Sequence, residues 1–248
     1  MIPDWQLPPG VDRGLWDYLH AADMVAGYDD QMRTSPLAAA DVAFCERAFG
    51  PAGRLVDLGC GTGRLCGHFA AKGFECVGVD LSDEMLAKAR ANVPSAAFLK
   101  ANLVDLSELS ERSFDCAACL FSTLGMVRGA ENRAKVIANA FRLLKPGGRF
   151  VLHAHNRFFR GLGAVRVTGQ FLRTLFGRGS AGDIAMSQAY GGAPLTLHHF
   201  TRREVVGVLS GAGFRTLGVV PLRTDGGRAN WPTAVRAYGW LILAERPA

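Results

Sequence analysis

The chain has 248 residues, of which 49% are hydrophobic and 20% charged, and its formal net charge is +6 at pH 7. This length and composition predict a single α/β domain that can bury a sizeable core. No apolar stretch approaches the length of a membrane span, and the first residues lack the basic and apolar regions of a secretory leader, so we expect a cytoplasmic protein.

Strands and helices are predicted to alternate from residue 54 onward. We expect strands over residues 54–58, 75–80, 97–100, 114–121, 149–153, 214–220 and 238–245. Helices are expected over 64–72, 83–92 and 131–144, and from a capping box at 201–204 to near 211–213. This order predicts a doubly wound, mostly parallel seven-stranded Rossmann-like sheet, with ligands beyond the carboxyl ends of its strands.

A glycine turn at Gly59-Cys60-Gly61-Thr62-Gly63 follows the first predicted strand, and Asp57 stands two residues before it. Glycines at alternate positions allow positive φ and let a ligand lie against bare backbone near a helix N-terminus. A dinucleotide fingerprint would place its third glycine where this chain has Arg64. Asp57 would also repel a pyrophosphate, whereas it suits a ligand with cationic groups. The spacing therefore favours a sulfonium cofactor over a nicotinamide dinucleotide.

The second predicted strand ends at Asp80, about 20 residues after the first glycine. At that distance an α/β site places a carboxylate on ribose hydroxyls, and the alternative is an exposed loop aspartate. The apolar strand before Asp80 and the helix start at 82–85 favour ribose binding.

With these two motifs the chain resembles the class I S-adenosylmethionine-dependent methyltransferases. Residues 113–117, 144–150, 200–204 and 212–214 resemble later segments of that family in the expected order. The resemblance implies S-adenosylmethionine as the cofactor and a helical lid within residues 1–50. It also implies cofactor contacts from Tyr28, Arg33, Asp57, Gly59, Cys60, Gly61, Gly63, Asp80, Leu81, Asn102, Leu103 and Phe121.

Three of these contacts depart from the family pattern or lie in its variable part. Asn102 stands where the family often has an aspartate that accepts a hydrogen bond from adenine; its amide oxygen can still accept, and the alternative is a turn asparagine. Tyr28 could close over the sulfonium and Arg33 could pair with the methionine carboxylate, while simple packing is the alternative for both.

The reaction that the resemblance implies is an in-line methyl transfer, in which the protein positions the reactants and removes a proton where needed. His155, after the fifth predicted strand, is the first candidate base, and His198 and His199 are the second. A histidine satisfied by structure or solvent is the alternative for each. We assign no metal site, because Cys116 and Cys119 should point to opposite faces of one strand.

Residues 156–200 form an insertion that carries five arginines and one acidic residue, Asp183, among many apolar side chains. We expect a helix that covers the substrate pocket, with arginines that recognise an anionic group, phosphate or a lipid surface through 157–178. The alternative is an amphipathic helix with a solvated arginine face. The division is thus a lid (1–50), a cofactor-binding core (51–155), the insertion (156–200) and a C-terminal part (201–248) with a helix and two strands.

The acceptor is expected to be a small acidic or hydrophobic molecule. The residues after the fourth predicted strand, 120–123, contain neither the Asn/Asp-Pro-Pro-aromatic nor the Pro-Cys pattern of nucleic-acid base methylation. Two alternatives remain: a methyltransferase that binds tRNA or another RNA through the basic insertion, and a cofactor-binding module without catalysis. The sequence predicts no oligomeric state. Six scattered cysteines are expected to be reduced and buried.

Overall fold

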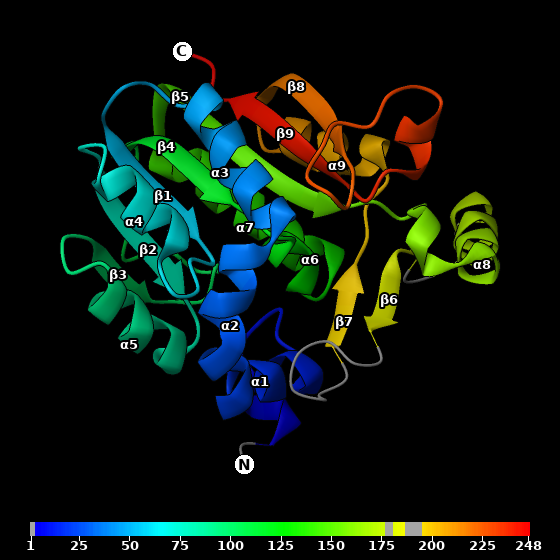
Figure 1. Cartoon of the computed structure of the whole chain (residues 1–248), viewed down its shortest axis with the longest axis horizontal. Helices are drawn as coiled ribbons and strands as arrows, with labels where there is room; N and C mark the ends of the chain where they lie inside the picture. Colours follow the sequence, from blue (N-terminus) through cyan, green and yellow to red (C-terminus); the bar gives the residue numbers. More distant parts are fainter. Residues whose placement is uncertain (1–2, 177–180, 187–194) are drawn as a thin grey trace.

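Seven strands form one sheet, in the order β3-β2-β1-β4-β5-β9-β8. The computed structural model describes residues 3–176, 181–186 and 195–248, with only the backbone of 22–26 (Figure 1). The strands are β1 (Arg54–Leu58), β2 (Glu75–Asp80), β3 (Ala97–Lys100), β4 (Phe114–Cys119), β5 (Leu144–His155), β8 (Arg215–Leu222) and β9 (Gly239–Glu245). β1 to β5 pair in parallel, whereas β9 is antiparallel to β5 and β8. The predicted mostly parallel, doubly wound sheet is confirmed.

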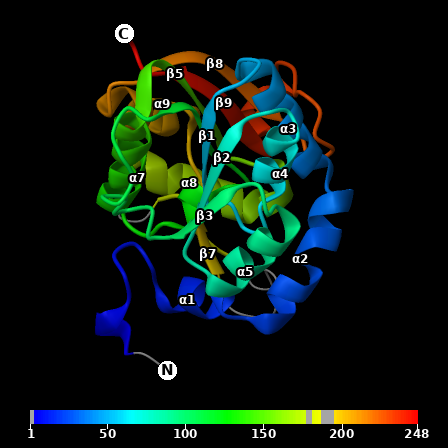
Figure 2. The same ribbon diagram turned by 90° about the vertical axis from the view of Figure 1, so that its left-hand side faces the viewer.

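Helices cover both faces of the sheet (Figure 2). α3 (Pro36–Ala48), α4 (Arg64–Ala70) and α5 (Asp83–Asn92) lie on one face, and α7 (Ala130–Leu143) and α9 (Arg202–Gly211) lie on the other. Successive strand residues point to opposite faces, so the two cores separate along each strand. Leu55 belongs to the core under α4, whereas Val56 and Leu58 belong to the core under α7.

Several element boundaries differ from those expected. β4 ends at Cys119 and not at residue 121, because Phe121 and Ser122 take positive φ values of 51° and 65°. β5 extends from Leu144 to His155, since Leu144 already pairs with Phe114 across an irregularity in register. α4 ends two residues earlier than expected, at Ala70.

Residues 3–50 contain three α-helices, and two of them lie at the carboxyl ends of the central strands. These are α1 (Arg13–Leu19) and α2 (Ala22–Thr34), which follow the short 3-10 helix η1 (Asp4–Gln6) (Figure 1). α3 differs from them, because it packs on the face of the sheet beside β5 and β9. α1 and α2 therefore occupy the place expected of a lid, and α3 belongs to the helical layer.

The insertion differs from the single cover helix that we expected. It contains η2 (Arg160–Leu162), α8 (Ala164–Leu175) and two strands, β6 (Asp183–Met186) and β7 (Leu195–His198), which pair antiparallel. The paired strands bury alternate apolar side chains against α1, and α8 lies at the periphery (Figure 1). Four-residue strands give too short an alternation to stand out in the sequence, so this pairing was missed.

The rest of the fold consists of short connections. α6 (Thr123–Met126) follows β4, and the 3-10 helix η3 (Thr233–Arg236) precedes β9. The six cysteines, all of them within described segments, are free and buried. Among the described residues, no helix has both the length and the apolar character needed to cross a membrane.

Candidate active site

The glycine turn is held between β1 and β2 by backbone hydrogen bonds. The amides of Gly59 and Cys60 donate to the carbonyl of Val79 over 2.8 and 3.0 Å. Gly59 has a φ of +84°, and a Cβ there would lie 2.4 Å from Cγ2 of Thr123 at the start of α6. This turn thus requires glycine at Gly59 both for its backbone conformation and for the close approach of Thr123.

Tyr28 of α2 lies over the turn. A Cβ at Gly61, where φ is +54°, would lie 3.3 Å from the Tyr28 ring and hydroxyl. Burial raises the pKa of Tyr28, so that its hydroxyl stays protonated. The lid therefore presents a neutral phenol to bare backbone, as expected for a residue that closes over a bound ligand.

Asp80 fixes the turn from the end of β2. Its Oδ2 accepts a hydrogen bond from the amide of Gly61 over 2.8 Å, and its Oδ1 accepts one from Ser82 over 3.0 Å. Burial raises the pKa of this carboxyl, while these amides oppose that shift. Each carboxylate oxygen keeps a further lone pair, so Asp80 can hold the turn and still accept hydrogen bonds from hydroxyls.

A cavity opens in front of Asp80 and encloses about 750 Å³, including the solvent at its mouth. This volume is in the range of sites for small ligands and cofactors. Seven of the twelve predicted cofactor contacts line it: Tyr28, Gly59, Gly61, Asp80, Leu81, Asn102 and Leu103. The segment before α1 also contributes to its wall, through Gly10 and Val11.

Asn102 forms a turn after β3 and contacts the N-terminal segment. Its Oδ1 accepts a hydrogen bond from the amide of Val104 over 3.0 Å, which is the turn geometry of the alternative interpretation. Its Nδ2 donates to the carbonyl of Pro9 over 2.8 Å and so ties the N-terminal segment across the cavity. One lone pair of Oδ1 is left for adenine, and this contact stays a prediction.

A second cavity of about 900 Å³ continues from the first toward β5 and the β6–β7 pair. Asp57, Cys60 and Phe121, three more of the predicted contacts, line it. Five residues line both cavities and mark the passage between them: Tyr18, Tyr28, Gly59, Thr123 and Met126. A ligand bound at Asp80 can thus extend past the glycine turn into the second cavity.

Asp57 gives this passage a distinct electrostatic character. It is only 4% exposed, and burial raises the pKa of its carboxyl to about 7. The carboxylates of Asp80 and Asp41 raise this pKa further, and the guanidinium of Arg64 lowers it. A buried carboxylate favours a nearby positive charge, so the residues present fit a nucleoside with a cationic tail.

Arg33 and Gly63 do not line either cavity. The Arg33 guanidinium is 75% exposed and pairs with Asp30 over 3.0 Å on the outside of α2. Gly63, at the N-cap of α4 with a φ of +83°, faces Phe98 and Ala89, so that it serves close packing. Both residues line a separate hollow beside α2 and α4, and their contacts with the cofactor stay predictions.

Arg64 supplies the positive charge that we had assigned to Arg33. It lines the second cavity, and its Nη1 donates to the carbonyl of Ala38 over 2.8 Å. Its Nη2 lies 3.9 Å from the buried carboxylate of Asp41, which bonds His153 on β5 over 2.8 Å. These contacts hold the Arg64 side chain between α3 and the cavity. In the sequence, Arg64 is notable only because it stands where a dinucleotide fingerprint has its third glycine.

His155 is the candidate base that lines the second cavity. Its Nε2 lies 2.8 Å from the hydroxyl of Tyr238, and its Nδ1 is buried without a partner among the described residues. Burial, followed by the neighbouring rings of His199 and His153, lowers the pKa of His155 well below its usual range. The imidazole is thus neutral near pH 7 and able to accept a hydrogen bond.

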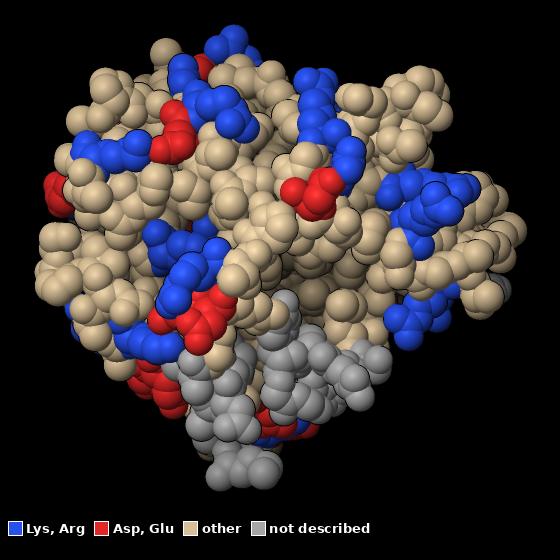
Figure 3. All heavy atoms as spheres, viewed as in Figure 1, with Lys and Arg blue, Asp and Glu red and all other residues tan. Residues whose placement is uncertain are grey.

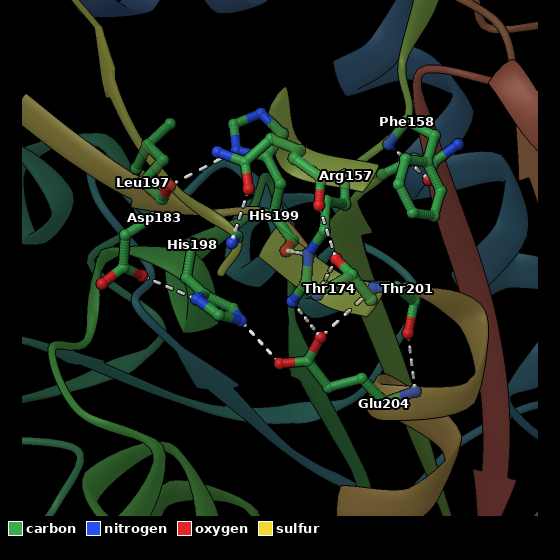
Figure 4. A network of polar contacts seen from close by, with 12 residues as sticks. Arg157, Phe158, Thr174, Asp183, Leu197, His198, His199, Thr201 and Glu204 are labelled. Carbon is green, nitrogen blue, oxygen red and sulfur yellow. Dashed lines mark hydrogen bonds and ion pairs between the residues drawn. The ribbon is translucent and has the colours of Figure 1, made fainter. Parts of the chain in front are cut away.

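His198 and His199 lie outside both cavities, so the structure does not support them as bases. Nδ1 of His198 lies 2.7 Å from Asp183, and its Nε2 lies 2.6 Å from Glu204, which leaves no nitrogen for a substrate proton (Figure 4). His199 directs Nδ1 to the carbonyl of Leu197, and burial lowers its pKa to about 4.

The polar network around His198 joins the insertion to the rest of the fold. Glu204 belongs to the capping box of α9 and also pairs with Arg157, whose Nη1 donates to Thr174 of α8 over 3.1 Å (Figure 4). Asp183 of β6 additionally pairs with Arg128 over 3.3 Å. This network fixes the paired strands whose Met186, Leu195 and Leu197 line the second cavity.

Comparison with known proteins gives one family match. A family model described as a methyltransferase domain matches residues 56–152. Over 108 residues, 43% of this chain, the chain is 33% identical to YqeM, a Bacillus subtilis protein named as a methyltransferase. It is 32% identical, over 42% of its length, to the ubiquinone biosynthesis O-methyltransferase of Dechloromonas aromatica.

The solved structures extend the likeness over nearly the whole fold. The CcbJ methyltransferase from Streptomyces caelestis is 18% identical with a TM-score of 0.68, and the match covers 94% of this chain and 99% of that one. The matches to the two curated relatives span 44% and 45% of the lengths of those relatives.

Proposed function

We propose that this chain, which carries a class I S-adenosylmethionine-dependent methyltransferase domain, methylates a small and largely apolar molecule in its second cavity. The observation that carries this proposal is the continuity of the two cavities past the glycine turn. The adenosine part of the cofactor would occupy the first cavity, beside Asp80 and Leu103. Its methionine part would reach Asp57 and Arg64 in the passage and the second cavity.

The residues of the site suit this division of the cofactor. Asp80 would accept hydrogen bonds from the ribose hydroxyls, and Asp57 and Arg64 would pair with the ammonium and carboxylate groups. Tyr28 and the segment before α1 would exclude water from the glycine turn. When bound, the cofactor supplies an electrophilic methyl group on its sulfonium.

The pair formed by His155 and Tyr238 is suited to orient the acceptor and receive its proton. A neutral His155 would accept the hydrogen bond of the Tyr238 hydroxyl at Nε2, and the hydroxyl of the methyl acceptor would donate to the Tyr238 oxygen. As the acceptor loses its proton to the Tyr238 oxygen, the Tyr238 proton passes to Nε2 of His155. A related protein named as an O-methyltransferase supports a hydroxyl as the acceptor.

The walls of the second cavity favour a small molecule over RNA. Apolar and aromatic side chains form most of its lining: Tyr18, Tyr28, Met32, Leu65, Leu120, Phe121, Met126, Met186, Leu195, Leu197 and Tyr238. The four arginines of the insertion that the structure describes, Arg157, Arg160, Arg166 and Arg173, line neither this cavity nor the first, and Arg178 lies outside the described residues. Six buried, unpaired cysteines support the cytoplasm as the compartment.

The test is methyl transfer from isotopically labelled S-adenosylmethionine to a fractionated extract of small molecules. We expect one labelled product. Tyr238→Phe and His155→Gln should each lower kcat/KM for its formation by about a hundredfold or more, the usual range for a lost proton acceptor. His68→Gln, at an exposed histidine beside Glu46, is the matched control and should leave the rate unchanged.

Two results would redirect the proposal. Label on tRNA, together with tRNA binding that falls steeply with salt, would identify an RNA methyltransferase instead. Normal affinity for S-adenosylhomocysteine without label on any acceptor would identify a cofactor-binding module that does not catalyse methyl transfer.

A further inference from the structure

Helix α8 exposes large apolar side chains on its outer side. The exposed fractions are 88% for Val165, 55% for Phe171, 46% for Leu172, 66% for Leu175 and 69% for Phe176. The spacings of 3, 4, 7 and 11 residues among them place these five residues along one side of the helix. We call this set the α8 apolar face.

The side of α8 that faces the protein is polar and well bonded. Gln170 is buried and accepts a hydrogen bond from the amide of Gly182 over 2.9 Å. Thr174 accepts the hydrogen bond from Arg157 that links α8 to the network around His198. The helix therefore buries only Gln170 and half-buries Val167, and it leaves its large apolar side chains outward, unlike an ordinary surface helix. Exposure of this face is thus fixed by specific contacts.

The surroundings of the α8 apolar face are positively charged. Arg160, Arg166 and Arg173 are exposed, and within the described part of the chain none of them forms an ion pair. Residues 157–176 contain no acidic side chain. Around α8, at the right-hand edge of Figure 3, basic and uncharged atoms are visible, and the acidic groups lie elsewhere on this view.

We infer that α8 binds an anionic lipid surface. An amphipathic helix that combines Phe and Leu on one side with arginines on its flank is suited to lie in the headgroup region of a bilayer. The apolar face would enter the acyl boundary, and Arg166 and Arg173 would contact lipid phosphates beside it.

Other occupants fit these observations less well. RNA would neutralise the arginines but leave five large apolar side chains in water. A second copy paired through the same face would bring the two arginine-flanked helices together, and like charges oppose such contact. The inference does not depend on which acceptor the enzyme methylates.

Vesicle flotation of the full chain tests this inference. Vesicles of phosphatidylcholine with added phosphatidylglycerol should bind the protein, and phosphatidylcholine alone should bind it much less. The variant Phe171→Ser/Leu175→Ser should weaken binding at least tenfold, because it lacks the two apolar side chains that move from water into the bilayer when the wild type binds. Leu217→Ser, at a 42% exposed leucine of β8, is the matched control and should bind normally.

The arginines provide a second, independent arm of the test. Arg166→Gln/Arg173→Gln should weaken binding to anionic vesicles about thirtyfold, from roughly fivefold per arginine, and should reduce its salt dependence. Arg33→Gln/Arg47→Gln, on the exposed sides of α2 and α3, should have little effect.

Absence of binding to anionic vesicles would overturn the inference, as would binding that the Phe171→Ser/Leu175→Ser variant retains. A concentration-dependent dimer in sedimentation that this variant abolishes, without vesicle binding, would assign the face to a second copy. All variants change exposed residues, and unaltered circular dichroism would show that each one folds.

Discussion

Protonation of Asp57 should control cofactor affinity near neutral pH. Burial raises the pKa of this carboxyl to about 7 in the unliganded protein, so about half of the molecules carry a neutral Asp57 at that pH. Only the charged form attracts the ammonium and sulfonium groups of S-adenosylmethionine. Binding of the cofactor therefore requires release of this proton wherever it is present.

The magnitude follows from proton linkage. If only the ionised form binds tightly, the apparent Kd rises by the factor of one plus ten to the power of pKa minus pH. With a pKa of about 7 this factor is close to one at about pH 8 and about tenfold at about pH 6. Asp57→Asn should weaken binding at the higher pH and remove most of the pH dependence.

Isothermal titration calorimetry with S-adenosylhomocysteine and S-adenosylmethionine measures both effects. The sulfonium compound should show the steeper pH dependence, because it has one more positive charge near Asp57. Asp105→Asn, at an exposed carboxylate with a lowered pKa, is the control and should bind as the wild type does. Equal affinity of the wild type at both pH values would refute the reasoning.

Three further predictions concern stability and can be measured by urea unfolding of the unliganded protein. Gly59→Ala should lower the free energy of unfolding by about 2 kcal/mol or more, because the new Cβ would lie 2.4 Å from Thr123. Gly73 also has a positive φ but faces open space, so Gly73→Ala should lower it by only about 1 kcal/mol. Equal losses in the two variants would argue against the clash. Because the pKa of Asp57 is higher in the folded protein than in the unfolded chain, protonated Asp57 stabilises the fold. This stabilisation is complete below about pH 4 and is lost as the pH rises toward 7. Asp57→Asn should thus be more stable than wild type at about pH 8, by up to about 4 kcal/mol, and this difference should shrink at low pH. His198→Ala should cost about 1 to 2 kcal/mol, since it removes one hydrogen-bond partner from each of two partly buried carboxylates that keep Arg128 and Arg157, and a cost near zero would contradict a structural role for the network.

The fold could be predicted from sequence wherever local signals repeat over a whole element. Apolar strands followed by amphipathic helices predicted the alternation of elements and the mostly parallel sheet, and the turn at Gly59 and Gly61 marked the candidate cofactor site at the end of β1. The spacing from this turn to Asp80 was equally informative, because both lie at adjacent strand ends that parallel pairing brings together.

The second cavity depends on contacts that local sequence patterns do not contain. Tyr238 meets His155 only because β9 folds back antiparallel to β5 and brings together residues 83 positions apart. In the sequence, Arg64 stands out only because it replaces the third glycine of a dinucleotide fingerprint. Its place in the cavity wall follows from the position of α3, whose Ala38 carbonyl accepts its hydrogen bond. His198 looked like a base until the structure placed a carboxylate at each of its nitrogens.

The insertion shows the same limit on a larger scale. Its apolar and basic composition predicted an amphipathic helix, and α8 is one. Composition does not tell which side of a helix faces the protein, however, and here Gln170 is the buried residue of α8. The cavity wall that we had assigned to this helix is supplied by β6 and β7.

A crystal structure with S-adenosylhomocysteine would test the central claim most directly. We predict the ribose at Asp80, the amino acid end beside Asp57 and Arg64, and the sulfur in the passage beside Tyr28, open toward His155 and Tyr238 in the second cavity. A sulfur that points away from the second cavity, or a nucleoside bound elsewhere, would contradict the proposed site.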